Sequence, residues 1–228
     1  MSFYARFIKK GTAAPWRRPF RIRRTRWERD ESMRVGVLAL QGDVSEHARM
    51  LTELGSQTVL VKRRPQLEGL QGLVIPGGES TTIGKLMREY NLLLPIRAMA
   101  QAGMPVFGTC AGLIVLAKEI EGASEAHLGL MDIGVNRNSF GRQRESFETD
   151  LEIFEIGTDL FPAVFIRAPH VTWVGDGVRV LAHYQDRVVA VRENNLLGLS
   201  FHPELTGDAR LHQYFLSMVK ESVKVFEG

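Results

Sequence analysis

Short apolar runs alternate with segments of helical spacing over the first half of this chain, beginning at Met33. The first run, Arg34–Leu40 (RVGVLAL), is aliphatic and partly β-branched, which is typical of a buried strand. The turn Gln41–Asp43 and the helical segment 44–54 follow it. Parallel strands need crossover connections, so this alternation predicts an α/β fold: a three-layer, doubly wound, mostly parallel sheet of the flavodoxin-like kind.

The same reasoning extends along the chain. It predicts further strands at 58–62, 73–76 and 105–108, and helices at 82–90 and 93–102. The second half contains short apolar runs separated by polar turns, and predicts strands at 128–135, 151–156, 163–166, 171–174, 178–184, 187–192 and 196–201. A helix over 208–225 closes the chain.

The balance of basic and acidic residues changes near residue 33. Of 29 Lys and Arg and 26 Asp and Glu residues, ten basic and three acidic ones lie in residues 1–32, which leaves 19 basic and 23 acidic ones beyond. We interpret residues 1–32 as a basic N-terminal extension, disordered or a remnant of expression, ahead of a start at Met33. The alternative is a basic arm for RNA, a membrane or a partner. For the domain over 33–228 the mildly acidic balance predicts no nucleic-acid binding.

Two further compositional features limit where the protein works. The longest mostly apolar stretch, Met104–Ala117, is too short to span a bilayer, and no secretory signal is visible. A single cysteine excludes an intrachain disulfide and a cysteine-based zinc site. We therefore expect a cytoplasmic protein without membrane attachment.

Two glycine-rich turns follow predicted strands. Pro76–Ser80 (PGGES) comes after one strand, and Gly108–Gly112 (GTCAG) comes after the next. The carboxyl ends of parallel strands form the usual ligand edge of such sheets. G-x-C-x-G is the cysteine version of the nucleophile elbow, which exposes the sulfur at a helix N-terminus. A lone cysteine is more often a buried apolar residue, but the flanking glycines favour Cys110 as a nucleophile.

A cysteine nucleophile needs a base with an orienting group. His202 ends an apolar strand, and Glu204 two residues later can reach back to its ring. His170 is the second candidate for the base. The remaining histidines have no special neighbours in the sequence and are predicted to be surface or core residues: His47, His127, His183 and His212.

Several motifs carry a resemblance to a known family. They are LQGD at 40–43, PGGESTT at 76–82, FGTCAGLI at 107–114, RNSFGRQ at 137–143, FIRAPH at 165–170 and SFHPELT at 200–206. Together they resemble the class I, or triad, glutamine amidotransferases. Within that class they are most similar to the glutaminase subunits of pyridoxal 5′-phosphate synthase, the PdxT/Sno family. The likeness runs from Met33 to near the C-terminus and does not include residues 1–32.

The resemblance implies a reaction and a site. Cys110, His202 and Glu204 would hydrolyse L-glutamine to glutamate and ammonia, with no cofactor and no metal. The oxyanion would be stabilised by Gly77, Gly78 and Ala111. Glutamine would be held by Gly78, Glu79, Ser80, Arg137, Ile166 and Arg167. The ammonia would pass to a synthase subunit in a hetero-oligomer, for vitamin B6 biosynthesis.

Other interpretations are open or fail on spacing. Gly78–Lys85 resembles a phosphate-binding loop, but five residues separate its glycines and Leu86 replaces the magnesium-binding Ser or Thr. No metal-ligand motif is evident. The alternatives that stay open are the glutaminase subunit of another amidotransferase, such as that of histidine biosynthesis, a cysteine hydrolase such as a peptidase, and a non-catalytic binding module.

Overall fold

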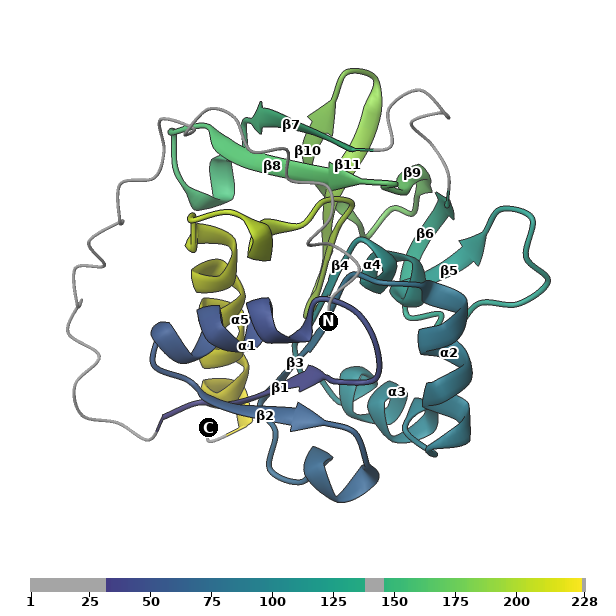
Figure 1. The fold of residues 1–228 in the computed structure, drawn as a ribbon, viewed down its shortest axis with the longest axis vertical. Coiled ribbons are helices and arrows are strands. Elements are labelled where there is room, and N and C mark those ends of the chain that lie inside the picture. Colours follow the sequence, from purple (N-terminus) through teal and green to yellow (C-terminus); the bar gives the residue numbers. More distant parts are fainter. Residues whose placement is uncertain (1–31, 138–145, 227–228) are drawn as a thin grey trace, which may run out of the picture.

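A computed structural model of the protein describes residues 32–137 and 146–226 (Figure 1). Residues 1–31, and with them nearly all of the basic extension, lie outside the described residues. So do Asn138–Gln143 of the RNSFGRQ motif. The division of the chain at residue 32 therefore stays a prediction.

Parallel strands form the part of the sheet that carries the glycine turns. Their spatial order is β2-β1-β3-β4-β12, and every neighbouring pair is parallel. Their bounds are β1 Arg34–Leu38, β2 Gln57–Val61, β3 Gly72–Ile75, β4 Val106–Thr109 and β12 Leu196–Leu199. This is the strand order of flavodoxin-like sheets, so the predicted fold class is confirmed.

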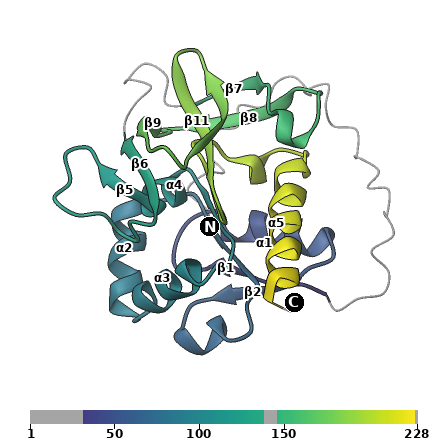
Figure 2. The ribbon, with the colours of Figure 1, turned by 180° about the vertical axis from the view of Figure 1, so that it is seen from behind.

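Helices cover both faces of this sheet (Figures 1 and 2). One face carries α1 (Val44–Glu53) and α5 (Arg210–Phe226), and the other carries α2 (Ser80–Glu89), α3 (Leu93–Gln101) and the short α4 (Ala111–Leu116). The result is the predicted three-layer arrangement.

Successive strand residues point to opposite faces, and the two cores follow that period. In β3, Leu73 and Ile75 belong to the core under α2 and α3, whereas Val74 belongs to the core under α1 and α5. In β4, Val106 and Phe107 divide in the same way. The central strands are therefore buried on both sides, as their continuous apolar sequences predict.

The sheet continues beyond β12 in the order β12-β11-β9-β6-β5, with β10 paired to β11. These pairs are antiparallel except for β6 and β5, which are parallel. A separate two-stranded sheet of β7 and β8 lies beside them (Figure 1). The bounds are β5 Ala117–Ile120, β6 Met131–Asn136, β7 Ser146–Leu151, β8 Phe161–Ile166, β9 His170–Val174, β10 Arg179–Tyr184 and β11 Arg187–Glu193. The short 3₁₀ turns are η2 (Arg64–Leu67), η3 (Phe154–Ile156) and η4 (Pro203–Leu205).

Two expectations for this half are wrong. The strand predicted at 151–156 lies at 146–151, and Phe154–Ile156 forms a 3₁₀ turn beside α5. Leu151 and Ile153 are buried, whereas Phe154 at the start of the turn is 77% exposed. Strand β5 was not predicted, since its sequence AKEI continues directly from α4 without a turn residue.

One negative finding concerns membranes. Within residues 32–137 and 146–226, no helix combines the length and the hydropathy that crossing a bilayer requires.

Candidate active site

Three neighbouring strands bring the predicted site together at their carboxyl ends. Strand β3 leads into the turn Pro76–Ser80, β4 leads into Cys110, and β12 leads into His202. Cys110 and His202 are far apart in sequence, but their strands pair directly, with Thr109 opposite Leu199. The sheet therefore places the predicted nucleophile, the predicted base and a glycine turn on adjacent strands.

Cys110 sits at a tight strand-to-helix turn. Its backbone has φ 48° and ψ −103°, and α4 begins at the next residue. Such a left-handed conformation in a residue other than glycine is strained and is typical of nucleophile elbows. A Cβ on Gly108 would come within 2.5 Å of the Gly112 backbone, and one on Gly112 within 2.1 Å of the Ile75 carbonyl oxygen. Only glycine fits at both positions that flank the cysteine.

Backbone hydrogen bonds set His202 beside this elbow. The Cys110 N–H donates to the Leu199 carbonyl over 2.8 Å, and the His202 N–H donates to the Val164 carbonyl over 2.8 Å. Phe201 between them is fully buried against Phe161 and Phe165. The end of β12 is thus anchored on two sides, and His202 is 1% exposed.

Glu204 folds back beneath His202 because η4 turns the chain immediately after it. Pro203 occupies the first position of that turn, where its fixed φ is favourable. Glu204 Oε1 lies 2.7 Å from His202 Nδ1, and the carboxylate is completely buried. This engages His202 Nδ1 and leaves Nε2 available, and Cys110 is the neighbour that acts most strongly to raise the pKa of His202.

The charges around His202 favour its protonated form. Burial alone would lower the pKa of His202, but the negative charges of Cys110 and Glu204 and the nearby Asp43 carboxylate, 3.3 Å from Nδ1, raise it well above its ordinary value. Burial raises the pKa of the Glu204 carboxyl, and the neighbouring His202 opposes that shift. The arrangement can therefore hold a cysteine thiolate beside an imidazolium.

Gly77 and Gly78 form the wall next to this pair. A Cβ on Gly77 would come within 2.3 Å of His202 Cε1, so the turn passes directly along the imidazole ring. The Gly77 carbonyl accepts a hydrogen bond from the Asp43 N–H over 3.2 Å, and the Gln41 side chain accepts one from the Glu79 N–H over 2.6 Å. The turn after β1 thus holds the glycine turn in place, and Ala111 opens α4 on the other side of Cys110.

Two of the predicted glutamine-binding side chains meet at the start of α2. Glu79 caps the helix, accepting hydrogen bonds from the Thr81 and Thr82 N–H groups. Although burial acts the other way, its bonds with Thr82 and Thr81 lower the pKa of Glu79. The Arg137 guanidinium reaches Thr81 Oγ1 over 3.4 Å from the end of β6. Ser80, the first residue of α2, is buried.

Ile166 and Arg167 approach Cys110 from the end of β8. The Ile166 carbonyl oxygen lies 3.8 Å from Cys110 Sγ. Arg167 follows with φ 42°, a strained conformation for arginine, and its side chain is exposed. The predicted site residues therefore lie at the ends of β3, β4, β6, β8 and β12 or in the residues that follow them.

Asp43 is a site residue that was not predicted from the sequence. Its Oδ2 lies 3.3 Å from His202 Nδ1, and the side chain is 8% exposed. The signal was its position directly after β1, a strand next to β3 in the parallel sheet.

His47 and His212 were expected to be ordinary histidines, and the structure places them below the triad. His47 Nε2 lies 3.3 Å from Glu204 Oε2, and His47 Nδ1 lies 2.9 Å from His212 Nε2. Both side chains are fully buried. The signal available in the sequence was their position on the apolar faces of α1 and α5, where a polar side chain needs a partner.

Acidification is expected to destabilise the fold through His212. Burial lowers the pKa of His212 to about 3 from an ordinary 6.5. Between these values the unfolded chain binds a proton that the folded chain does not, so stability is lost as the pH falls below 6.5. From pH 7 to pH 5 this amounts to about 2 kcal/mol.

Urea unfolding at both pH values measures this loss. His212→Leu should reduce the difference between pH 7 and pH 5 by about that amount. Leu216→Ala, which removes a buried apolar side chain of the same helix, should lower stability equally at both. An unchanged pH difference in His212→Leu would contradict the assignment.

One cluster among the described residues has the proximity of a metal-ligand set. Ligand atoms of Asp43, His202 and Glu204 lie within 4.8 Å of one another. Two of them, His202 Nδ1 and Glu204 Oε1, already share the 2.7 Å hydrogen bond described above. The set therefore fits the orientation of an imidazole by carboxylates, with His202 Nδ1 engaged.

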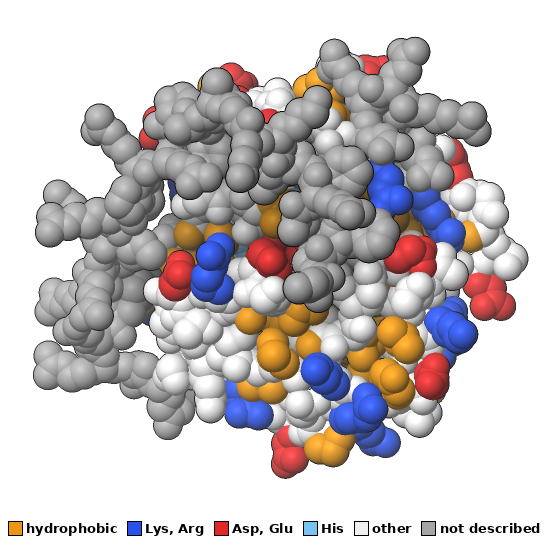
Figure 3. Space-filling view, in the orientation of Figure 1, with side chains coloured by type: hydrophobic (Ala, Val, Ile, Leu, Met, Phe, Trp, Pro, Cys, Tyr) orange, Lys and Arg blue, Asp and Glu red, His pale blue; other side chains and the backbone are white. Residues whose placement is uncertain are grey.

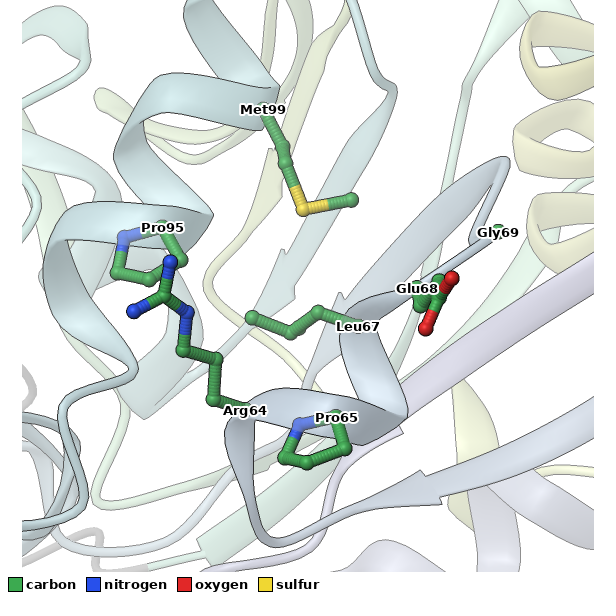
Figure 4. Close-up of a pocket in the computed structure, with 7 residues that line it drawn as sticks. All are labelled: Arg64, Pro65, Leu67, Glu68, Gly69, Pro95 and Met99. Atoms are coloured by element: carbon green, nitrogen blue, oxygen red, sulfur yellow. The ribbon is translucent and has the colours of Figure 1, made fainter.

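A groove of about 570 Å³ lies between η2 and α3, apart from these residues. Leu67 and Met99 point toward one another within it (Figure 4). Its lining is completed by Arg64, Pro65, Glu68, Gly69 and Pro95, none of them a nucleophile or an imidazole. The groove therefore lacks the nucleophile and the base that the chemistry described above requires.

On the face seen in Figure 3, basic side chains are interspersed with acidic and apolar ones.

Comparisons with known proteins agree with the geometry. The SNO glutamine amidotransferase family matches residues 37–221. A pyridoxal 5′-phosphate synthase subunit PdxT of Geobacillus kaustophilus is 62% identical over 190 residues, covering 83% of this chain and 96% of that protein. The PdxT subunit of Geobacillus stearothermophilus is 60% identical over 190 residues, with 83% of this chain and 96% of that protein covered.

Solved structures support the same fold. A crystal structure of a glutamine amidotransferase superposes with a TM-score of 0.78 at 52% identity, covering 82% of this chain and 98% of that one. The structure of PurLQS from Thermotoga maritima has a TM-score of 0.64 at 17% identity, covering 82% of this chain and 99% of that one. The second likeness bears on the fold alone.

Proposed function

This chain belongs to the SNO glutamine amidotransferase family, and we propose that Cys110, His202 and Glu204 are the triad with which it hydrolyses L-glutamine. The observation that carries the proposal is the buried His202, hydrogen-bonded at Nδ1 to Glu204 over 2.7 Å and close enough to Cys110 for that residue to raise its pKa. A nucleophile and base in contact, with the base oriented by a third group, is the arrangement that nucleophilic catalysis requires.

The first half of the reaction releases ammonia. The Cys110 thiolate attacks the side-chain carboxamide carbon of glutamine and forms a tetrahedral intermediate. His202, protonated because its pKa is raised, donates its proton to the departing nitrogen. The carbon–nitrogen bond breaks, ammonia leaves, and a glutamyl thioester on Cys110 is left behind.

The second half restores the enzyme. His202, now neutral, accepts a proton from water as that water attacks the thioester carbon. Collapse of the second tetrahedral intermediate breaks the carbon–sulfur bond and releases glutamate. Glu204 keeps the imidazole in one orientation through both halves and stabilises each imidazolium that forms.

The oxyanion of both intermediates needs backbone donors. Gly77 and Gly78, together with Ala111, are the groups proposed for this role. The positions of Gly77 beside the His202 ring and of Ala111 directly after Cys110 support it. Glutamine would be held by Gly78, Glu79, Ser80, Arg137, Ile166 and Arg167, and the Ile166 carbonyl oxygen 3.8 Å from Cys110 Sγ supports this placement.

The ammonia serves the synthesis of pyridoxal 5′-phosphate by a separate synthase subunit. Support comes from the PdxT relatives, which are named as subunits of that synthase and are about as long as the matched region of this chain. The histidine-biosynthesis branch finds no such support. A cytoplasmic location is part of the proposal, because the reaction uses a reduced cysteine.

The synthase subunit is expected to raise the glutaminase rate by about 10²–10³-fold, the cost of one missing oxyanion donor. The Gly77 carbonyl is held by the Asp43 N–H, and the next residue, Gly78, has φ +152°. Glycines at this turn let the peptide between them reorient with little steric cost. Docking near Gln41 and Gly77 would then complete the oxyanion site.

Ammonia release at saturating glutamine, with and without excess synthase, is the experiment that tests both the function and this activation. Hydrolysis of glutamine that needs Cys110 supports the function. Equal rates with and without the partner would show that the oxyanion site is already complete in the isolated chain, and would leave the triad proposal in place. No hydrolysis in either condition would contradict the function itself.

A further inference from the structure

Behind Glu204 lies a buried chain of polar side chains that the reaction as described does not use. Glu204 Oε2 lies 3.3 Å from His47 Nε2, and the same nitrogen lies 3.0 Å from Thr109 Oγ1. His47 Nδ1 lies 2.9 Å from His212 Nε2. The four side chains come from α1, β4, η4 and α5, and each is buried to within 1% of full burial.

Both histidines of this chain are neutral. Burial, with the neighbouring His212 and His202 acting in the same direction, lowers the pKa of His47 well below its ordinary value. Burial alone lowers the pKa of His212 to about 3. A neutral imidazole carries one N–H, so each ring offers one donor and one acceptor.

Only one pair of tautomers suits the carboxylate. If His47 carried its proton on Nδ1, a lone pair on Nε2 would face the negative Glu204, and His212 Nδ1–H would be a buried donor without a partner. With the proton on His47 Nε2, that N–H donates to Thr109 Oγ1 over 3.0 Å and lies beside Glu204 Oε2, 3.3 Å away. His212 then donates its Nε2–H to His47 Nδ1, and only an acceptor is left unpaired at His212 Nδ1.

We propose that His47, held by His212 and Thr109, is a positioning residue whose Nε2–H, set 3.3 Å from the outer oxygen of Glu204, keeps that carboxylate charged and aimed at His202. This inference rests on the proposed function, since it concerns how the triad is supported. It assigns a role in catalysis to two histidines that touch neither substrate nor nucleophile.

The need for such a donor follows from the surroundings of Glu204. Burial raises the pKa of its carboxyl, and the basic side chains that lie against its oxygens among the described residues are His202 and the neutral His47, with no Lys or Arg. Asp43, the other acid that faces His202, acts on Glu204 in the same unfavourable direction. A neutral N–H stabilises the carboxylate without adding a positive charge that would compete with the imidazolium of His202.

The proton on His47 can be observed directly in the whole chain. Nitrogen-15 NMR of the histidine-labelled protein at pH 7 distinguishes the two neutral tautomers of each ring. We expect His47 to be the Nε2–H tautomer, with its resonances assigned by their loss in His47→Gln. A His47 ring protonated on Nδ1, or charged at pH 7, would overturn the inference whatever the activity.

The reactivity of the cysteine gives an independent readout. The chain contains one cysteine, so the rate of alkylation by iodoacetamide as a function of pH reports on Cys110 alone, without glutamine or synthase. In His47→Leu, Glu204 loses the neighbouring N–H of the imidazole, and His202 becomes less basic. The midpoint of the alkylation profile should then rise by about one pH unit, a tenfold change in equilibrium.

The variants separate positioning from packing. With the synthase present, kcat of His47→Leu should fall about 10–100-fold with KM little changed, as is typical when an outer-shell partner of a functional group is removed. His47→Gln can place an amide N–H near the Nε2 position and should recover most of the wild-type alkylation profile. Leu51→Ala, a buried apolar change in the same helix, should lower stability and leave the profile unchanged.

The outcomes are decisive in either direction. A wild-type alkylation profile in a folded His47→Leu protein, or the same shift in Leu51→Ala, would overturn the positioning role. If His47→Leu does not fold, His212→Phe should show a smaller shift of the same sign, and no shift there would count against the inference. Glutamine hydrolysis that persists in Cys110→Ala would contradict the proposed function instead, so the two failures are distinguishable.

Discussion

Replacing Cys110 with alanine is expected to abolish glutamine hydrolysis while leaving the fold intact. The change removes the sulfur that forms the thioester, and loss of a catalytic nucleophile costs about 10⁶-fold in turnover. Alanine keeps the Cβ that the elbow already accommodates at φ 48°. It deletes only the Sγ atom, which lies 3.8 Å from the Ile166 carbonyl oxygen. Ammonia release in the presence of the synthase subunit measures the effect.

Two controls accompany this variant. Its thermal unfolding should match that of the wild-type protein, and it should bind the synthase as the wild type does. Retained hydrolysis in a protein without its one cysteine would remove the whole mechanism. If Cys110→Ala loses both its activity and its fold, Cys110→Ser is the variant to measure instead. It keeps the size of the side chain and should be just as inactive.

His202→Asn is expected to lower turnover by several orders of magnitude, because the members of a triad act as a unit. Asparagine can keep a hydrogen bond to Glu204 near the former Nδ1 position but cannot carry a proton between Cys110 and the substrate. The matched variant is His170→Asn, the second candidate base of the sequence. Its loss should be much smaller, and ammonia release again measures both.

The surroundings of the two histidines explain the expected difference. The groups that raise the pKa of His202 are Cys110, Glu204 and Asp43. Burial lowers the pKa of His170, and the charges that act on it belong to Arg187, Glu121 and Asp186, none of them in the site. Equal losses in the two variants, or a larger loss in His170→Asn, would reassign the base.

Much of the fold was predictable from local patterns. Buried parallel strands are apolar on both faces, so runs such as Arg34–Leu38 and Val106–Thr109 stand out without any knowledge of their neighbours. The strands of the second half were harder to predict from the sequence. Strand β7 alternates between exposed and partly buried residues, and its position depends on where the chain turns to bury Ile153.

Some residues of the candidate site were likewise predictable from local sequence, and others were not. The elbow of Cys110 and the spacing of His202 and Glu204 were visible because each is built by a few consecutive residues. Asp43 and His47 were not assigned to the site, because nothing within their own segments distinguishes them from a turn acid and a core histidine. They reach Glu204 and His202 only because α1 follows the strand beside β3 in the folded sheet.

The sequence by itself thus determined the strand and helix alternation, the glycines around Cys110 and the residues that resemble a triad, because these follow from steric limits and periodicity over short segments. Only the tertiary structure decided which charged and polar groups meet. The distances that set the pKa of His202, the burial that makes Glu204 depend on a neutral donor, and the pairing of His47 with His212 all join residues from separate elements. Electrostatic interactions change steeply with distance and burial, so they are settled by packing rather than by local pattern.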